Sequence, residues 1–351
     1  MPSLPLRESA YIISRCGEAL HSMRRWLAIF AVFIVGSIAV SGCDGDPSYT
    51  VYFQSDRNGN WDIYSIQHDG TMEAQVTDHP ADDLYPVVNS DGTKVAFIRR
   101  SGNATDVILV DTEEGNEINL TNGRAGGTIE SITWYPEGDR LLVTLWTMGL
   151  ASGRPQLYWM GEEGMADDDT GMHLLGQDTA YSYWNPRMNA AGEEIAVSAS
   201  LSLESVDVHI LDSAGQFIRV VPHETFLRPT GEFRAPTATE DYADYAPNGR
   251  DVIMQSNAPA LTNPSNAIHL WYVSSQGRRS ADLTPDAPYN SMQPAWSTVL
   301  DGQTIVFASD RDGNNEIYLW SQTEGAEPVR LTDNPANDSN PSWLRNDPNA
   351  D

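Results

Sequence analysis

The sequence predicts an all-β protein that folds as a six-bladed β-propeller with four-stranded blades. Short runs of β-branched and aromatic residues recur six times along the chain, at intervals of 44 to 57 residues. Helical periodicity is missing after the first 42 residues, which excludes solenoids built from helices. A repeat of about 45 to 55 residues that holds four short strands is typical of a propeller blade.

The elements of each repeat follow one order. The recurring runs are residues 51–53, 95–97, 141–143, 195–197, 252–254 and 305–307. Five of them are preceded by a turn with glycine near its end, such as NSDGTK or VLDGQT, and glycine accepts the positive φ of a hairpin turn. A second alternating strand and a short third strand follow each run. A further strand, carrying Pro or Trp, then precedes the next glycine turn and completes the four.

The last predicted strand, residues 341–344, has no successor in the chain. We expect it to pair with the strands of residues 51–64 and so to complete the first blade. This closure predicts one propeller domain over residues 50–346, followed by a short tail over residues 347–351. Blades arranged in a closed ring also avoid the exposed edge strands of an open sheet.

The residues ahead of the propeller are typical of an exported lipoprotein. Residues 23–42 combine two arginines, an apolar run and small residues before a cleavage point, as a secretory signal peptide does. The sequence VSGC at its end resembles the bacterial lipobox, which implies that Cys43 becomes the lipidated N-terminus, with a linker over residues 43–49. Two or more acyl chains anchor a protein stably at a membrane. A plain signal anchor with an incidental cysteine is the alternative. Residues 1–22 fit no leader pattern, and we interpret them as a misassigned start or an unstructured extension.

Composition restricts the function further. The formal net charge is −28, and without residues 1–42 the chain holds 17 basic and 47 acidic residues, a net charge of −30. Such a surface repels phosphate backbones, so a nucleic-acid partner is not expected. The only other cysteine, Cys16, lies in the leader, which leaves no thiol for a disulfide or a structural zinc site. We expect a monomer without a cofactor.

Two segments resemble a known repeat family. The sequences SDRNGNWDIY at residues 55–64 and SDRDGNNEIY at residues 309–318, with LTDNPANDSNPSW near the end, resemble the repeats of TolB-like β-propellers. The resemblance covers about residues 49–345 and implies a six-bladed ring. TolB carries an α/β domain ahead of its propeller, whereas here only the seven residues 43–49 lie between the predicted signal peptide and the first strand, so this chain is predicted to be a propeller-only lipoprotein.

Motifs for chemistry are few. No G-x-S-x-G nucleophile elbow occurs, and His223-Glu224 lacks the second histidine of a zinc protease motif. Asp310, Asp312 and Asn314 repeat the oxygen spacing of a calcium loop, but the glycine at position six and the glutamate at position twelve are absent. We interpret this segment as a tight strand connection, with calcium as the weaker alternative.

The residues that enter the first strand of each blade are predicted to surround one mouth of the central channel, where propellers commonly bind ligands. They combine acidic and aromatic side chains, which suit a cation, a basic peptide or a sugar. These candidate binding residues are Asp82, Asp83, Tyr85, Glu130, Tyr181, Tyr183, Asp241, Tyr242, Asn290, Asp338 and Asn340.

Two functions follow from these features. The first is an extracytoplasmic binding module, held at the cell envelope by its lipid, that recognises a protein, peptide or glycan through the channel rim. The alternative is a hydrolase in which rim carboxylates act as general acid and base. Two carboxyl groups that converge in a closed pocket would favour the enzyme, and a shallow funnel would favour the binding module.

Overall fold

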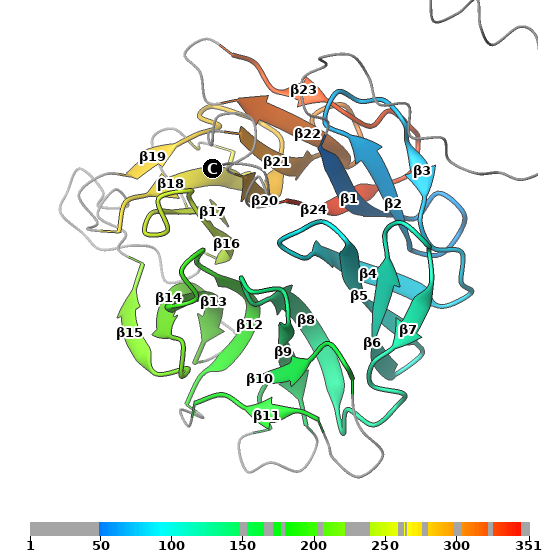
Figure 1. The fold of residues 1–351 in the computed structure, drawn as a ribbon. Coiled ribbons are helices and arrows are strands. Elements are labelled where there is room, and N and C mark those ends of the chain that lie inside the picture. Colours follow the sequence, from blue (N-terminus) through cyan, green and yellow to red (C-terminus); the bar gives the residue numbers. More distant parts are fainter. Residues whose placement is uncertain are drawn as a thin grey trace, which may run out of the picture. The chain divides into compact units, whose positions relative to one another are not determined.

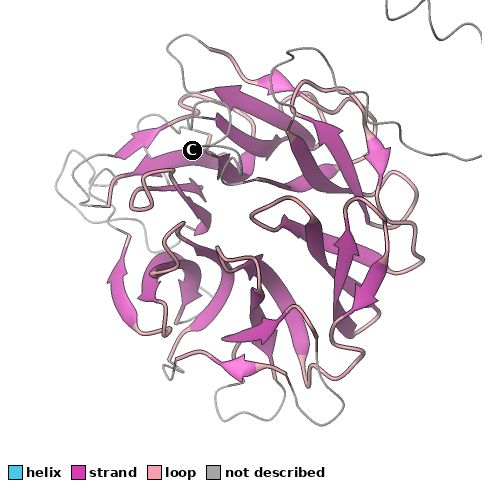
Figure 2. Cartoon of the chain, viewed as in Figure 1, coloured by secondary structure: helices cyan, strands magenta, loops and turns pink. Residues whose placement is uncertain are grey.

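A computed structural model describes the propeller through residues 49–147, 153–164, 171–176, 180–201, 206–221, 239–258, 263, 265–275, 280–297, 304–321 and 326–344. The predicted leader with Cys43, and the predicted tail, lie outside these residues. Within them the chain forms strands and loops only (Figure 2). The described part therefore contains no helix with the length and apolar character needed to cross a membrane.

The strands form six antiparallel four-stranded sheets arranged around a common centre, which confirms the predicted six-bladed β-propeller (Figure 1). Blade 1 holds β24 (Asp338–Trp343), β1 (Thr50–Ser55), β2 (Asp62–Gln67) and β3 (Ala74–Gln75). Blade 2 holds β4 (Asp82–Val88), β5 (Lys94–Ser101), β6 (Ala104–Asp111) and β7 (Glu117–Asn119). Blade 3 holds β8 (Thr128–Trp134), β9 (Arg140–Trp146), β10 (Gln156–Gly161) and β11 (His173–Leu174).

The second half of the ring repeats this order from the innermost strand outward. Blade 4 holds β12 (Ser182–Met188), β13 (Glu194–Ser200), β14 (Asp207–Asp212) and β15 (Phe217–Val220). Blade 5 holds β16 (Glu240–Tyr245), β17 (Val252–Ser256), β18 (His269–Val273) and β19 (Ser280–Asp282). Blade 6 holds β20 (Ser291–Ser297), β21 (Thr304–Ser309), β22 (Glu316–Ser321) and β23 (Val329–Arg330).

The ring closes as the sequence predicts, because β24 is the innermost strand of blade 1. It pairs antiparallel with β1, Val51 opposite Trp343 and Ser55 opposite Asp338. The red end of the chain therefore lies beside its blue beginning in Figure 1. Asp56 reinforces this closure, since its two carboxylate oxygens accept hydrogen bonds from the backbone N–H and the side-chain amide of Asn337 at 2.8 and 3.0 Å.

The hydrophobic core lies between neighbouring blades. It consists of six clusters, and each cluster joins the facing sheets of two adjacent blades. The runs that mark the repeat supply it, since Phe53, Phe97 and Phe307 from the second strands are fully buried. Every blade is thus packed on both faces, so the stability of each blade depends on its neighbours.

Each inner strand carries a β-bulge, and the bulge turns one side chain toward the centre. In five of the six inner strands the bulged residue is a non-glycine residue with positive φ: Tyr85, Asn185, Tyr242, Gln293 and Asn340. Four of these residues precede a proline, which disfavours right-handed helical backbone at that position. Such strained backbone persists only where the surroundings fix it.

Side chains of the preceding blade fix four of these bulges. The backbone N–H of Tyr85 donates to Gln54 Oε1, and that of Asn340 donates to Gln293 Oε1, both at 2.9 Å. Asn185 and Gln293 are held in the same way by Ser131 and Gln255 at 2.9 Å. The positions of the channel-facing side chains are therefore set by contacts between blades.

Candidate binding site in the central channel

The inner strands β4, β8, β12, β16, β20 and β24 surround a central channel that is lined along its whole length. The first halves of β4, β8, β12 and β16, with Trp146 and Pro155, form a wide mouth with a cavity of about 340 Å³. The lining of this mouth is Tyr85, Glu130, Trp146, Pro155, Trp184, Asn185, Asp241 and Tyr242. Two carboxylates and four large aromatic rings therefore meet at one end of the channel.

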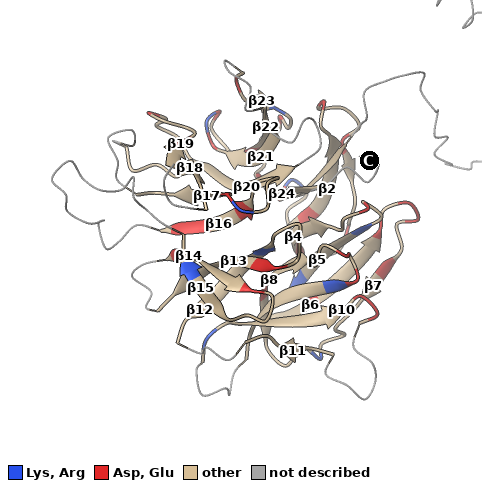
Figure 3. Ribbon diagram, turned by 60° about the vertical axis from the view of Figure 1, so that its left-hand side comes forward, with Lys and Arg blue, Asp and Glu red and all other residues tan. Residues whose placement is uncertain are grey.

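Asp241 and Glu130 differ in how firmly they are held. The carboxylate of Asp241 accepts hydrogen bonds from Asn185 Nδ2 at 2.9 Å, from the backbone N–H of Tyr242 at 2.7 Å and from the Ser198 hydroxyl. Glu130 is half-buried and makes no hydrogen bond to any residue in the described part of the chain. Asp241 is thus a fixed acceptor, and Glu130 keeps its acceptor capacity for a ligand. Figure 3 marks the acidic residues of the ring in red, those of β16 among them.

The aromatic groups of the mouth are partly fixed and partly exposed. Burial raises the pKa of Tyr242 far above its ordinary value, and burial also raises the pKa of Tyr85, with Arg100 nearby acting in the opposite direction. Both phenols therefore stay protonated and are available as hydrogen-bond donors at neutral pH. Trp146 is 45% exposed, an unusual position for so large an apolar side chain. This exposure leaves a ring face accessible at the mouth.

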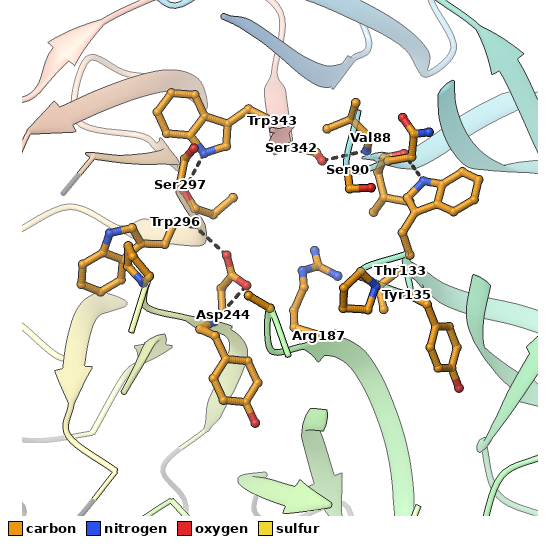
Figure 4. Close-up of a pocket in the computed structure, with 18 of the residues that line it drawn as sticks. Val88, Ser90, Thr133, Tyr135, Arg187, Asp244, Trp296, Ser297, Ser342 and Trp343 are labelled. Carbon is orange, nitrogen blue, oxygen red and sulfur yellow. Dashed lines mark hydrogen bonds between the residues drawn. The ribbon is translucent and has the colours of Figure 1, made fainter. Parts of the chain in front are cut away.

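The second halves of the inner strands and the turns that follow them form the narrow end, a cavity of about 80 Å³. Trp134, Trp296 and Trp343 line it, together with Arg187 and Asp244 (Figure 4). A middle section that includes Tyr85, Tyr242 and Arg187 connects the two ends. Because the three cavities share lining residues, they form one channel.

Repeat position explains which predicted residues reach the channel. Two residues before the bulge, each inner strand places a side chain between blades, and all six are nearly or fully buried: Asp83, Ile129, Tyr183, Glu240, Ser291 and Asp338. Asp83 forms a bidentate ion pair with Arg99, with Nε to Oδ1 and Nη2 to Oδ2 both at 2.8 Å. Asp338 pairs with Arg57 at 3.0 Å. These predicted rim residues are structural contacts.

In these two ion pairs, burial and pairing shift the pKa of the charged groups in opposite directions. Burial raises the pKa of Asp83 and of Asp338, because desolvation outweighs the hydrogen bonds and charges of their partners. The pairing raises the pKa of Arg99, although burial opposes it. The bidentate geometry of the Arg99–Asp83 pair and the partial exposure of both arginines favour charged pairs at neutral pH.

The other predicted residues divide in the same way. Tyr85, Glu130, Asp241 and Tyr242 line the mouth, and Asn340 lines the middle of the channel. Asp82 accepts a hydrogen bond from the backbone of Trp61, Asn290 donates two to Asp310, and Tyr181 packs against Tyr183 and His209. These three lie outside the cavities of the channel.

The calcium candidate occupies a strand connection in which its side chains bind protein groups. Asp310 accepts two hydrogen bonds from Asn290, and one Asp312 oxygen accepts from the Tyr318 hydroxyl. Asn314 donates to carbonyl oxygens of the following segment, including that of Asn334 at 3.0 Å. Among the described residues, no group of three or more His, Cys, Asp or Glu side chains is positioned for a metal ion.

Sequence reasoning missed several residues of the channel, among them Trp146, Trp184 and Arg187. Trp146 comes from the end of a second strand, and Trp184 and Arg187 lie inside an inner strand, whereas the prediction covered strand entrances. Arg187 had a detectable signal, since it is the only lysine or arginine in the six inner strands. A basic residue on a channel-facing strand of so acidic a chain is a candidate functional group.

Comparison with solved structures confirms the TolB-like propeller fold. TolB from Acinetobacter baumannii superposes with a TM-score of 0.61 at 16% identity, over 99% of this chain and 74% of that one. A putative TolB from Agrobacterium tumefaciens gives 0.56 at 16% identity, over 82% and 90% of the two chains. Hydrazine synthase from Kuenenia stuttgartiensis gives 0.65 at 15%, over 86% and 47%. The class that emerges is a six-bladed propeller of the TolB type.

Sequence matches cover a smaller part of the chain than the structural matches do. No family model matches the chain. An uncharacterized protein of Agrobacterium fabrum, Atu1656, is 30% identical over 112 residues, and an uncharacterized peptidase of Bacillus subtilis, YuxL, is 33% identical over 100 residues. Each match covers 28% of this chain, but only 38% and 15% of the respective relative. The likeness is therefore to a part of each relative.

Proposed function

We propose that the chain is an extracytoplasmic binding module of the cell envelope, anchored through Cys43, that binds a protein or peptide partner at the wide mouth of its channel. The observation that carries this proposal is the lining of the mouth, where Glu130 and Asp241 lie among four aromatic rings. Carboxylates and aromatic faces together attract a lysine or arginine side chain, by charge and by cation–π contact. The expected ligand group is therefore a cationic side chain.

The charge of the whole molecule supports this ligand class. A net charge of −28 attracts basic partners over distance, and the screening length near 8 Å at physiological salt limits this effect to the vicinity of the surface. Arg100 near Tyr85 opposes it only in part, because two carboxylates line the same cavity. Binding should accordingly weaken as salt rises.

Isothermal titration calorimetry tests the proposal with a blocked peptide that carries two adjacent lysines between glycines. The matched ligand replaces both lysines by norleucine, which keeps the length and removes the charge. We expect the lysine peptide to bind at least about tenfold more tightly, a difference of about 1.4 kcal/mol. Replacing Glu130 by Gln together with Asp241 by Asn should remove this preference, whereas Glu113→Gln, at an exposed turn, should not. Equal binding of both peptides to the wild-type protein would refute a cation-binding mouth.

The membrane anchor has its own test. Cys43→Ser should abolish lipidation and release the protein from membranes, because no thiol remains for acylation. Metabolic labelling with a fatty acid and fractionation of the membranes measure both effects. Acyl label on the variant, or its retention with membranes, would show that the anchor is elsewhere.

The hydrolase remains the second candidate because two carboxylates line a single cavity of the mouth. Asp241, held by three hydrogen bonds, would serve as a base, and Glu130 would serve as the acid. A screen of glycoside and peptide substrates tests this function. Turnover that is lost in Glu130→Gln and kept in Glu113→Gln would favour the hydrolase over the binding module.

A further inference from the structure

The narrow end of the channel contains a cation that the proposed function does not use. Arg187 lies at the junction of the middle section and the narrow end and borders both cavities. In Figure 4 its guanidinium points into the pocket. It remains partly accessible to solvent because it borders the channel, although protein surrounds it closely.

The guanidinium of Arg187 lacks an acidic partner within the described part of the chain. Its Nη1 donates one hydrogen bond, to the carbonyl oxygen of the adjacent Pro186 at 3.0 Å, and no described carboxylate forms an ion pair with it. A guanidinium carries five N–H donors, so most of its capacity is unused. Burial lowers the pKa of Arg187, and the opposing influence of Tyr242 and Asp241 does not cancel this effect. The charge is therefore only partly compensated by the protein.

Asp244, the acidic residue that lines the same cavity, is hydrogen-bonded to the backbone. Asp244 occupies the same position of blade 5 that Arg187 occupies in blade 4. Its two carboxylate oxygens accept hydrogen bonds from the backbone N–H groups of Tyr245 and Trp296 at 2.9 and 2.8 Å. Ser342 caps the backbone N–H of Val88 from the equivalent position of blade 1. Asp244 thus joins blades 5 and 6, and no ion pair between Asp244 and Arg187 forms.

We propose that the narrow end is a binding site for a single carboxylate group, held by the guanidinium of Arg187. Arginine binds carboxylates in a planar, bidentate manner, and a buried unpaired charge is costly unless a ligand completes it. The site lies beyond the mouth and concerns a different chemical group, so it does not depend on the proposed function.

The size and lining of the cavity favour a carboxylate over a phosphate. Its volume of about 80 Å³ exceeds the 10–15 Å³ or so that one water requires, and so admits a small group. Two of the three tryptophans have no indole N–H to offer a ligand. Trp134 Nε1 donates to the carbonyl oxygen of Val87, and Trp343 Nε1 donates to that of Ala295. Asp244 lines the same cavity, but its carboxylate already accepts two backbone N–H groups, so Arg187 is the group of the lining that can balance one negative charge. A phosphate carries nearly two negative charges.

Thermal unfolding at constant ionic strength tests this site with acetate as the probe and acetamide as its neutral isostere. We expect acetate to raise the Tm by about 2 °C at roughly ten times its dissociation constant, with a further rise that is logarithmic in its concentration, and acetamide to have no such effect. Arg187→Met should abolish the shift. Arg250→Met, which removes an exposed arginine from a turn of blade 5, should keep it. An equal shift in wild type and Arg187→Met would overturn the proposal.

Arg187→Lys provides a second test of the site if Arg187→Met does not fold. Arg187→Lys keeps the charge but lacks the planar fork, so its dissociation constant for acetate should rise about tenfold or more. An unchanged acetate affinity in Arg187→Lys would count against a bidentate site. Inorganic phosphate is the third arm: tighter binding of phosphate than of acetate to the wild-type protein would overturn the assignment to a carboxylate.

Discussion

The narrow end of the channel is built on all six inner strands and the wide mouth on four of them, yet the two ends carry different chemistry. The mouth gathers Glu130 and Asp241 among aromatic rings, whereas the narrow end holds Arg187 and the hydrogen-bonded Asp244 among three tryptophans. The strands, bulges and contacts between blades are shared. The difference teaches that the repeat fixes the scaffold positions, and that the remaining channel positions are free to carry ligand chemistry.

Arg187 and Asp244 show this distinction at a single repeat position. Both side chains follow the bulge of an inner strand by two residues. Asp244 is bound to two backbone N–H groups and belongs to the scaffold, whereas Arg187 contacts one carbonyl oxygen of its own strand. Equivalent positions can therefore be separated into structural and ligand-binding ones by their hydrogen bonds.

The largest expected effect comes from removing β24, the strand that closes the ring of blades. A chain truncated after Asn337 loses β24, and with it the buried Trp343 and the ion pair of Asp338 with Arg57. Loss of one buried tryptophan side chain costs about 3–5 kcal/mol, so we expect the free energy of unfolding to fall by at least this amount. Urea unfolding measures it. Truncation after Asn346 is the control, and similar stability of both truncated chains would contradict ring closure by β24.

The second largest effect on the free energy of unfolding is expected for Asp244, which should differ in this respect from Arg187 in the same cavity. Asp244→Ala removes the acceptor of two backbone N–H groups and should lower the free energy of unfolding by about 1–3 kcal/mol. Asp244→Asn keeps one oxygen and should cost less. If Asp244→Ala unfolds at the same urea concentration as the wild-type protein, Asp244 is not part of the scaffold.

Arg187→Met should have a smaller effect, of opposite sign. A buried charge without an acidic partner contributes little to stability, and a methionine of similar length fills the space. We expect the free energy of unfolding to stay equal or to rise by about 1 kcal/mol in the absence of ligand. A loss of more than about 1 kcal/mol, measured in urea, would mean that Arg187 is a structural residue.

The smallest effect on stability is expected at the mouth. Glu130 makes no hydrogen bond within the described part of the chain, so Glu130→Gln should change the free energy of unfolding by less than about 0.5 kcal/mol. The same substitution should weaken binding of the lysine peptide. A stability change comparable to that of Asp244→Ala would place Glu130 with the scaffold residues.

The fold could be predicted from the sequence because its signals are local and repeated. Glycine turns before the buried runs predicted the blades, and the unpaired strand ending at Trp343 predicted the closure that β24 and β1 form. The first and last repeats, which gave the resemblance to TolB-like propellers, are the two that Asp56 and Asn337 join. Each of these features requires only the period and the chemistry of turns.

The candidate site could be predicted only in part, because side-chain direction in a bulged strand is not a local property. Tyr85 and Asp83 both lie at the entrance of β4, but the bulge turns Tyr85 toward the channel and leaves Asp83 between blades with Arg99. The bulge depends on Gln54 of the neighbouring blade, 31 residues away. Arg187 was missed for a related reason, since its lack of an acidic partner becomes visible only in three dimensions.

The tryptophans allow both ends of the channel to be observed in one experiment, ¹⁹F NMR of the protein labelled with 5-fluorotryptophan. Trp146 and Trp184 report on the mouth, and Trp134, Trp296 and Trp343 report on the narrow end, with each resonance assigned by substitution to Phe. Trp320, in β22, is the reference. The lysine peptide should shift the two mouth resonances and acetate the three resonances of the narrow end, with Trp320 unchanged in both titrations. Shifts of the same resonances by both ligands, or shifts confined to Trp320, would contradict a channel with two chemically different ends.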